Sequence, residues 1–275
     1  MSTPMTAAVF GTDEDPVALR PVWASLPLSI TEAAAPAQLV AVDGRTADWV
    51  ADLAAALDSG AAGILLRAPS PGQDPDDIAA LAVRAASRSI PVLVESAWAT
   101  DPAVDAHRDS IAGELPSMAL IDVLSTIGAV DPQRPTLPAV ALDQLHLLRA
   151  IGVEPEQVQL SRWSPNSFTI VASRGPTRLV LSAVIGNCGP SKARVSARGP
   201  GSESSLLVFG SSNARPAEAE RTDAAGTVRL PSLYESASRA AWRRLHAAAA
   251  SGAVVDQLTG LAADLRRLAT IGPLS

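Results

Sequence analysis

Short apolar runs, each followed by a segment with helical periodicity, set the tightest limit on the fold of this chain. Residues 38–42, 63–66 and 91–95 are almost continuously apolar, and helical patterns separate them at residues 48–57 and 76–88. Strands that are apolar on both faces are typical of a parallel sheet that helices cover on both sides. The first half of the chain therefore predicts a doubly wound, Rossmann-like α/β domain.

The pattern changes after about residue 115, where strand-like runs follow one another with few helices between them. The strands are expected at residues 158–163, 167–173, 178–185, 193–197 and 206–209. The helices are expected at residues 142–151, 232–250 and 256–270. This order predicts an α+β domain with a mostly antiparallel, open sheet.

The change of pattern places the domain boundary between residues 118 and 119. Residues 1–118 would form the dinucleotide-binding type of domain, and residues 119–275 the sheet domain. The Gly- and Ser-rich segment 199–205 is predicted as a loop, and the polar segment 213–226 is expected to be partly mobile.

Composition excludes several classes of function. A net charge of −6, with no block of Lys or Arg, argues against nucleic acid as a partner. No apolar stretch is long enough for a membrane span, and no signal peptide is visible. The single cysteine, Cys188, cannot form an internal disulfide, which favours the cytoplasm. No cluster of residues has metal-ligand spacing, so no metal is expected.

In a doubly wound sheet the ligand crevice lies beyond the carboxyl ends of the strands. Asp43, Pro69 and Glu95 follow or end three predicted strands and would line it. Asp43 could bind a ribose hydroxyl, but a turn-forming Asp-Gly pair is the alternative. Glu95 ends a buried strand, so an ion pair with an arginine is favoured over a role as a base. His107 and His246 lie in polar helical segments and are expected to be solvated.

Three stretches of the chain are similar to the glucose-fructose oxidoreductase/inositol dehydrogenase (Gfo/Idh/MocA) family of sugar dehydrogenases. Residues 63–69 (GILLRAP) look like the strand of that family that ends in a proline. Residues 90–99 (IPVLVESAWA) are similar to its strand leading into a Glu-Lys-Pro turn. Residues 242–271 look like its terminal helix pair. The resemblance implies a Rossmann-type domain followed by an open-sheet domain.

The resemblance also implies NAD(P) as the cofactor, and here the chain departs from the family. The glycine-rich turn after the first strand corresponds to Gly11 and its neighbours, which hold one glycine and three carboxylates, and these would repel a pyrophosphate. Ser96 stands at the position of the Glu-Lys-Pro lysine, and a serine hydroxyl is no acid near neutral pH. The only lysine of the chain is Lys192.

The second signature of the family is an Asp followed one turn later by a His on the first helix of the C-terminal domain. Asp143 and His146 stand on the matching helix and would share one face, although their spacing is three and that of the family is four. Another alignment puts Ala139 or Val140 at the histidine position. These two residues are the candidate catalytic pair, and a pair on a helix surface or in an interface is the alternative.

Three functions follow from these observations. The first is a non-catalytic homologue that has no cofactor and acts as an associating subunit. Its partner would be a second copy or a paralogous dehydrogenase, bound by the C-terminal sheet through residues such as Leu179, Leu181 and Ala183. The second is an NAD(P)-dependent sugar or cyclitol dehydrogenase with a rearranged site, in which Arg20 and Arg67 hold the dinucleotide. The third is a small-molecule sensor or carrier.

Overall fold

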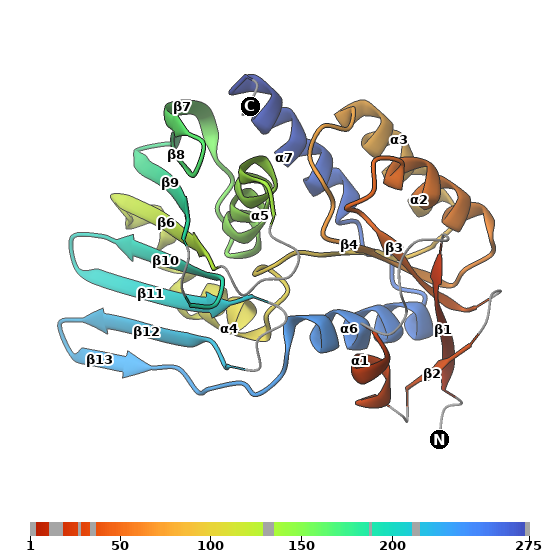
Figure 1. Ribbon diagram of the computed structural model, residues 1–275. Helices are drawn as coiled ribbons and strands as arrows, with labels where there is room; N and C mark the ends of the chain where they lie inside the picture. The colour runs from red at the N-terminus through yellow and green to blue at the C-terminus, as the bar shows by residue number, and fades with distance from the viewer. Residues whose placement is uncertain are drawn as a thin grey trace. The chain divides into compact units, whose positions relative to one another are not determined.

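The computed structural model describes residues 4–10, 19–26, 29–33, 37–128, 135–186, 189–210 and 215–272 (Figure 1). The chain forms two compact units. The first comprises Met1–Ser96 and Ala237–Leu265, and the second comprises Ala97–Ser236 and Arg266–Ser275. The C-terminal helices therefore return to the first unit, although the sequence pattern predicted a single domain over residues 119–275. Among the described residues, no helix is both long and apolar enough to cross a bilayer.

The first unit contains a five-stranded sheet in which every pairing is parallel, with the strand order β2-β1-β3-β4-β5. The strands are β1 (Met5–Phe10), β2 (Ile30–Glu32), β3 (Leu39–Asp43), β4 (Gly63–Arg67) and β5 (Val92–Glu95). The helices are α1 (Arg20–Ala24), α2 (Trp49–Asp58), α3 (Pro75–Ser87) and α6 (Ala237–Ser251), with the first part of α7 (Leu258–Thr270). The predicted doubly wound architecture is confirmed.

Helices cover both faces of this sheet because successive strand residues point to opposite sides. On one face, Trp23 of α1 and Trp242 of α6 meet edge to face at 5.5 Å and pack over Leu39 and Leu65. Helix α2 packs against β3 and β4, and α3 packs against α2. The outer edge of β5 is closed by the segment before α7, where the side chain of Gln257 accepts a 2.7 Å hydrogen bond from the N–H of Val94.

The second unit contains an eight-stranded sheet with the order β13-β12-β11-β10-β6-β9-β8-β7. Its strands are β6 (Leu120–Ile127), β7 (Glu156–Ser164), β8 (Ser167–Arg174), β9 (Thr177–Ile185), β10 (Lys192–Arg198), β11 (Ser202–Phe209), β12 (Glu218–Asp223) and β13 (Gly226–Arg229). Every pairing is antiparallel except that of β6 with β9. The mostly antiparallel sheet is confirmed, but the predicted loop at 199–205 is wrong in part, because β11 begins within it. The polar segment 213–226 contains β12.

Helices α4 (Pro102–Ile111) and α5 (Leu137–Ala150) pack on one face of this sheet, α4 over β11 and β12 and α5 over β6 and β9. Leu179, Leu181 and Ala183 of β9 have no exposed surface because they point towards this helical layer. The prediction that these three residues form an intersubunit contact is therefore wrong. The alternate residues of the same strands face the other side, where Leu124 is 46% and Val184 45% exposed.

Candidate functional site

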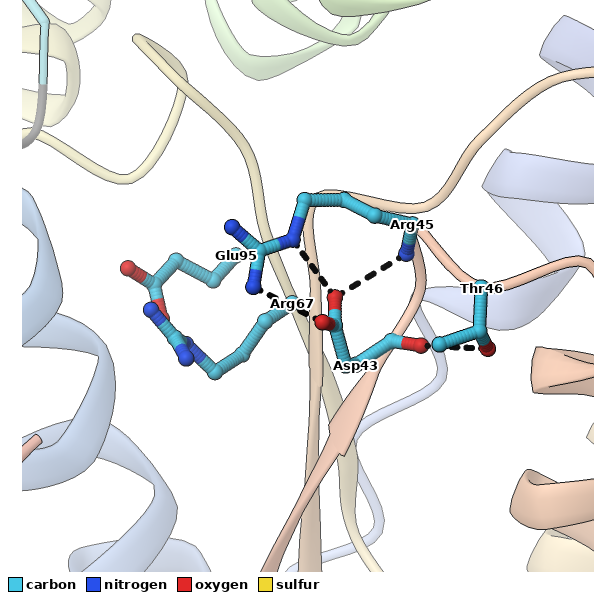
Figure 2. Close-up of polar contacts among 5 residues, drawn as sticks. All are labelled: Asp43, Arg45, Thr46, Arg67 and Glu95. Atoms are coloured by element: carbon cyan, nitrogen blue, oxygen red, sulfur yellow. Dashed lines mark hydrogen bonds and ion pairs between the residues drawn. The ribbon is translucent and has the colours of Figure 1, made fainter. Parts of the chain in front are cut away.

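Three charged residues stand side by side where β3, β4 and β5 end. In the sheet register, Asp43 is the partner of Arg67, and Arg67 is the partner of Glu95. Because parallel strands present their carboxyl ends at one edge, the charges of the three side chains alternate along that edge. Figure 2 shows this cluster together with Arg45 and Thr46, which follow β3. The sheet edge that the sequence predicted as a ligand crevice is therefore formed by residues of the first unit alone.

Arg67 and Glu95 form an ion pair in which Arg67 Nε donates to Glu95 Oε2 at 3.2 Å. Both side chains are largely buried, with 17% and 7% of their surfaces exposed. Removing a charge from water is costly unless an opposite charge compensates it. Arg67 and Glu95 therefore each stabilise the charged form of the other. The prediction that Glu95 pairs with an arginine is confirmed.

Asp43 binds Arg45, a residue that the sequence pattern did not single out. Arg45 Nε donates to Asp43 Oδ1 at 2.7 Å and Arg45 Nη2 to Asp43 Oδ2 at 2.7 Å, while the backbone N–H of Arg45 also donates to Oδ1. Burial raises the pKa of Asp43, but these hydrogen bonds and the charges of Arg45 and Arg67 outweigh it, so the pKa is lowered. The sequence signal was an Asx turn with an arginine two residues after the aspartate.

The turn after β3 lies against the turn after β4. The N–H of Gly44 donates to the carbonyl of Arg67 at 2.7 Å, and the N–H of Ser70 donates to the carbonyl of Gly44 at 2.7 Å. A Cβ atom at Gly44 would lie 2.5 Å from the Cα of Pro69, so a larger residue does not fit without a backbone shift. The Asp-Gly pair and Pro69 therefore have a structural role in joining two strand ends, which favours the turn interpretation of Asp43.

Ser96, at the position of the lysine in the Glu-Lys-Pro turn of the similar family, directly follows β5 and is 3% exposed. Its hydroxyl carries no charge, so a neutral residue occupies that position. At the end of the neighbouring strand β4, Ala68 between Arg67 and Pro69 has a φ of 43°.

The remaining dinucleotide candidates of the first unit add no further phosphate ligand. Gly11 and the carboxylates after it lie outside the described residues. The Nε of Arg20 donates to Glu32 Oε1 at 3.0 Å in an exposed pair. Within the described ranges, no group of His, Cys, Asp and Glu is arranged to hold a metal ion.

The second unit holds the other candidates, on α5. Asp143 Oδ1 accepts a 3.2 Å hydrogen bond from the N–H of Ala97. Burial raises the pKa of Asp143 to about 7, and the hydrogen bond from Ala97 opposes this shift only in part. A partly exposed carboxyl that titrates near neutral pH could give or take a proton in a reaction.

His146 lies one turn further along α5 and is 5% exposed. Burial and the charge of Arg149 lower its pKa to about 3, so its ring is neutral near pH 7. The structure records no hydrogen bond between Asp143 and His146 in the part of the chain it describes. Their predicted proximity on one helix face does not make them a hydrogen-bonded pair.

His107 of α4 is 1% exposed, so the prediction that it is solvated is wrong. Neither ring nitrogen has a hydrogen-bond partner among the described residues, and burial lowers its pKa to about 4. His107 lies on the buried side of α4 with Val104 and Ile111. The prediction failed because its neighbours in the sequence are charged, which suggested an exposed segment.

No protein-family model matches the chain, and no curated protein matches it. Solved structures do. UDP-N-acetylglucosamine 3-dehydrogenase GnnA from Acidithiobacillus ferrooxidans has a TM-score of 0.73 at 13% identity, over 97% of this chain and 96% of that one. KijD10, a 3-ketoreductase from Actinomadura kijaniata whose structure holds NADP and TDP-benzene, has a TM-score of 0.69 at 13% identity, over 98% and 97%. An oxidoreductase from Pseudomonas syringae has a TM-score of 0.73 at 14% identity, over 98% and 96%.

The chain has the fold of these oxidoreductases. The similarity covers nearly the whole of each chain, and it agrees with the parallel sheet of the first unit and the open antiparallel sheet of the second. The resemblance to the Gfo/Idh/MocA fold that the sequence indicated is confirmed at the level of the fold. At this low identity the similarity assigns no activity to the chain.

Proposed function

We propose that this chain is a homologue of the sugar oxidoreductases that no longer performs dinucleotide-dependent catalysis and acts as an associating subunit. The observation that carries the proposal is the edge of the parallel sheet, where Arg45 and Arg67 are each bound to a carboxylate of the chain itself. With one cysteine in the sequence, a reducing, cytoplasmic setting fits this role.

The charges at the sheet edge do not fit a pyrophosphate. A dinucleotide brings two negative charges and needs free N–H donors and cations to bind them. Here the carboxylates of Asp43 and Glu95 occupy the arginines, and the N–H of Gly44 is bonded to Arg67. A pyrophosphate would have to displace two carboxylates that would then lie buried beside it, so we expect no cofactor.

The open face of the eight-stranded sheet supports the associating role, with a second copy of this chain as the proposed partner. Leu124 and Val184 stand on adjacent strands of this face, and both are nearly half exposed. Around them lie polar and charged side chains, among them Arg194 beside Leu124 and the Arg198–Asp122 pair. An apolar centre with a charged rim is the usual composition of a protein interface. Across a two-fold axis the same patch would bind its own copy.

Light scattering coupled to size-exclusion chromatography tests the association. The proposal predicts a dimer for the native chain and a monomer for the double variant Leu124→Glu/Val184→Glu, because two carboxylates would be buried in each half of the contact. Val83→Glu is the matched control, since Val83 is 71% exposed on α3 of the other unit and its variant should stay dimeric. A native monomer, or a double variant that remains dimeric, contradicts the proposal. A mass that fits one copy plus a different chain would replace the second copy with a paralogous subunit.

A sugar or cyclitol dehydrogenase with a rearranged site is the second candidate. It is favoured by the pKa of about 7 at Asp143, which suits a proton-transfer group near neutral pH. This candidate requires an NAD(P)(H)-dependent activity that disappears in Asp143→Asn. It is abandoned if no reduced or oxidised dinucleotide binds the native protein.

A further inference from the structure

A polar groove of about 270 Å³ lies in the second unit where β7, β8 and β9 run side by side. The groove is made by the first residues of β7, the end of β8 and the hairpin into β9. Its lining residues are Gln157, Gln159, Val171, Ala172, Ser173, Gly175, Pro176, Thr177 and Arg178. None of these residues belongs to the cluster at the ends of β3, β4 and β5.

A break in the strand pairing forms the groove. The register passes from Glu156 opposite Ser173 to Gln159 opposite Val171, so β7 has one residue more than β8 over this interval. Such a bulge leaves the extra residue unpaired and bends the strand away from its neighbour. Gln157 lies inside the bulge at φ 47°, a left-handed conformation that is unfavourable for a residue with a Cβ. Strain of this kind is concentrated where a protein needs a side chain in a particular place.

Arg178 is the one charged residue among the lining residues, and it is exposed. Its guanidinium has no hydrogen-bond or ion-pair partner in the part of the chain that the structure describes. The side chain of Gln157 accepts a weak 3.4 Å hydrogen bond from Ser173 Oγ, which leaves its amide N–H groups free to donate. The groove therefore offers a guanidinium fork, carboxamide donors and a hydroxyl within one concave surface.

We propose that this groove binds the oxyanion group of a small polar molecule, with Arg178 as the principal ligand and Gln157 and Gln159 as further hydrogen-bond donors. A guanidinium matches the two oxygens of a carboxylate or a phosphate, and carboxamides add donors to oxygens or hydroxyls beside them. A volume of this size is at the lower limit of small-molecule sites and suits a ligand of a few carbon atoms. The proposal is independent of the proposed function, because it uses neither the ends of β3–β5 nor Leu124 and Val184.

Titration of the ¹⁵N-labelled full chain with sodium gluconate and, separately, with inorganic phosphate tests the groove. We expect saturable shifts of the backbone amides of Gln157, Ser173 and Arg178 with at least one of the two anions. Arg178→Gln should weaken that affinity about tenfold or more, because it removes a charge-assisted hydrogen bond. Arg162→Gln is the matched control, since Arg162 is also an exposed arginine of this sheet and does not line the groove.

Saturation by gluconate alone would assign the site to carboxylates, and saturation by phosphate alone would assign it to phosphates. Absence of saturable shifts with both anions overturns the proposal, as does an equal loss of affinity in Arg178→Gln and Arg162→Gln. The ¹H–¹⁵N spectrum of each variant shows whether it is folded. Because Arg178 is exposed and makes no contact that the fold requires, its variant should keep the native pattern of peaks.

Discussion

The end of the parallel sheet and the middle of α5 each present an aspartate, and the two have opposite surroundings. Asp43 accepts hydrogen bonds from the side chain and the backbone of Arg45, which together lower its pKa. Within the described part of the chain, Asp143 accepts one hydrogen bond, from Ala97, and burial raises its pKa to about 7. In the first unit, Arg45 therefore compensates the charge of Asp43. In the second unit, the ionised form of Asp143 is poorly compensated.

The two aspartates therefore have different consequences: one contributes to stability, and the other has a pKa suited to proton transfer. A compensated ion contributes to folding and resists exchange for a ligand, as the Arg67–Glu95 pair does. A carboxyl that is held neutral against its ordinary pKa reduces stability near pH 7, and such groups are concentrated at functional sites. Substitutions at four residues, two in each unit, test whether the difference holds.

The largest effect is expected at Asp143. The unfolded carboxyl ionises near 3.8 and the folded one near 7, so the free energy of unfolding decreases as pH rises between these values. Asp143→Asn keeps an oxygen for Ala97 and should stabilise the protein by about 4 kcal/mol at pH 8, at roughly 1.4 kcal/mol for each unit of pKa, with little effect below pH 4. Urea unfolding at the two pH values measures this. Asp109→Asn, on the exposed side of α4, is the control and should change little at either pH. A destabilised Asp143→Asn at pH 8 would show that the ionised carboxylate is well compensated.

The next effect is expected at Glu95. Glu95→Ala leaves Arg67 largely buried without this partner and should cost about 3 kcal/mol of unfolding free energy. Glu32→Ala breaks the exposed pair with Arg20 and should cost at most about 1 kcal/mol. Chemical denaturation of both variants at pH 7 compares them. Equal costs would mean that the strand-end pair is no more important for stability than a surface pair.

His107, also in the second unit, should affect stability with the opposite pH dependence to Asp143. Its pKa is 6.5 when unfolded and about 4 when folded, so the unfolded state binds the proton first and stability decreases as pH falls through this interval. At pH 5 the loss relative to pH 7 should be about 2 kcal/mol for this residue, and His107→Leu should remove it. His146 contributes in the same direction, so the variant keeps part of the acid sensitivity. An unchanged pH profile in His107→Leu, compared with the partly exposed control His246→Gln, contradicts the buried neutral ring.

The smallest effect is expected at Asp43. Asp43→Asn should cost about 1 kcal/mol at pH 7, because Arg45 is partly exposed and water screens the pair. Since the folded pKa is lowered, the contribution of the carboxylate is present above 3.8 and disappears as pH falls through the folded value. The variant and the native chain should therefore become equally stable in acid. A cost that persists at pH 2 would come from packing and not from charge.

The sequence predicted the parallel sheet well because β3, β4 and β5 are apolar on both faces and each ends at a polar residue. It missed β6, whose residues 120–127 alternate apolar and polar side chains too irregularly for a clear period. It placed His107 in a helical segment but gave no bounds for α4 and did not foresee its buried face. It also chose the wrong face of β9. Leu179 and Leu181 alternate with Val180 and Val184, so both faces are apolar in part, and only the position of α5 decides which face is buried.

The sequence predicted where the candidate site lies but not which side chains bind one another there. The strand ends identified Asp43, Pro69 and Glu95, because a parallel sheet gathers the residues that follow its strands. Arg45 was missed because its role depends on a turn geometry that returns its side chain to Asp43. The shifted pKa values of Asp143 and His107 depend on burial by segments distant in sequence, which no local pattern reveals.

Dinucleotide binding decides whether the first unit has lost its cofactor. The melting temperature of the native protein is followed during titration with NAD⁺, NADH, NADP⁺ and NADPH, since a ligand that binds only the folded state must raise it by mass action. With Arg45 and Arg67 bound to Asp43 and Glu95, we predict no change with any of the four. A saturable rise with one of them would show that a dinucleotide binds despite these ion pairs, and it would contradict the proposed loss of cofactor-dependent catalysis.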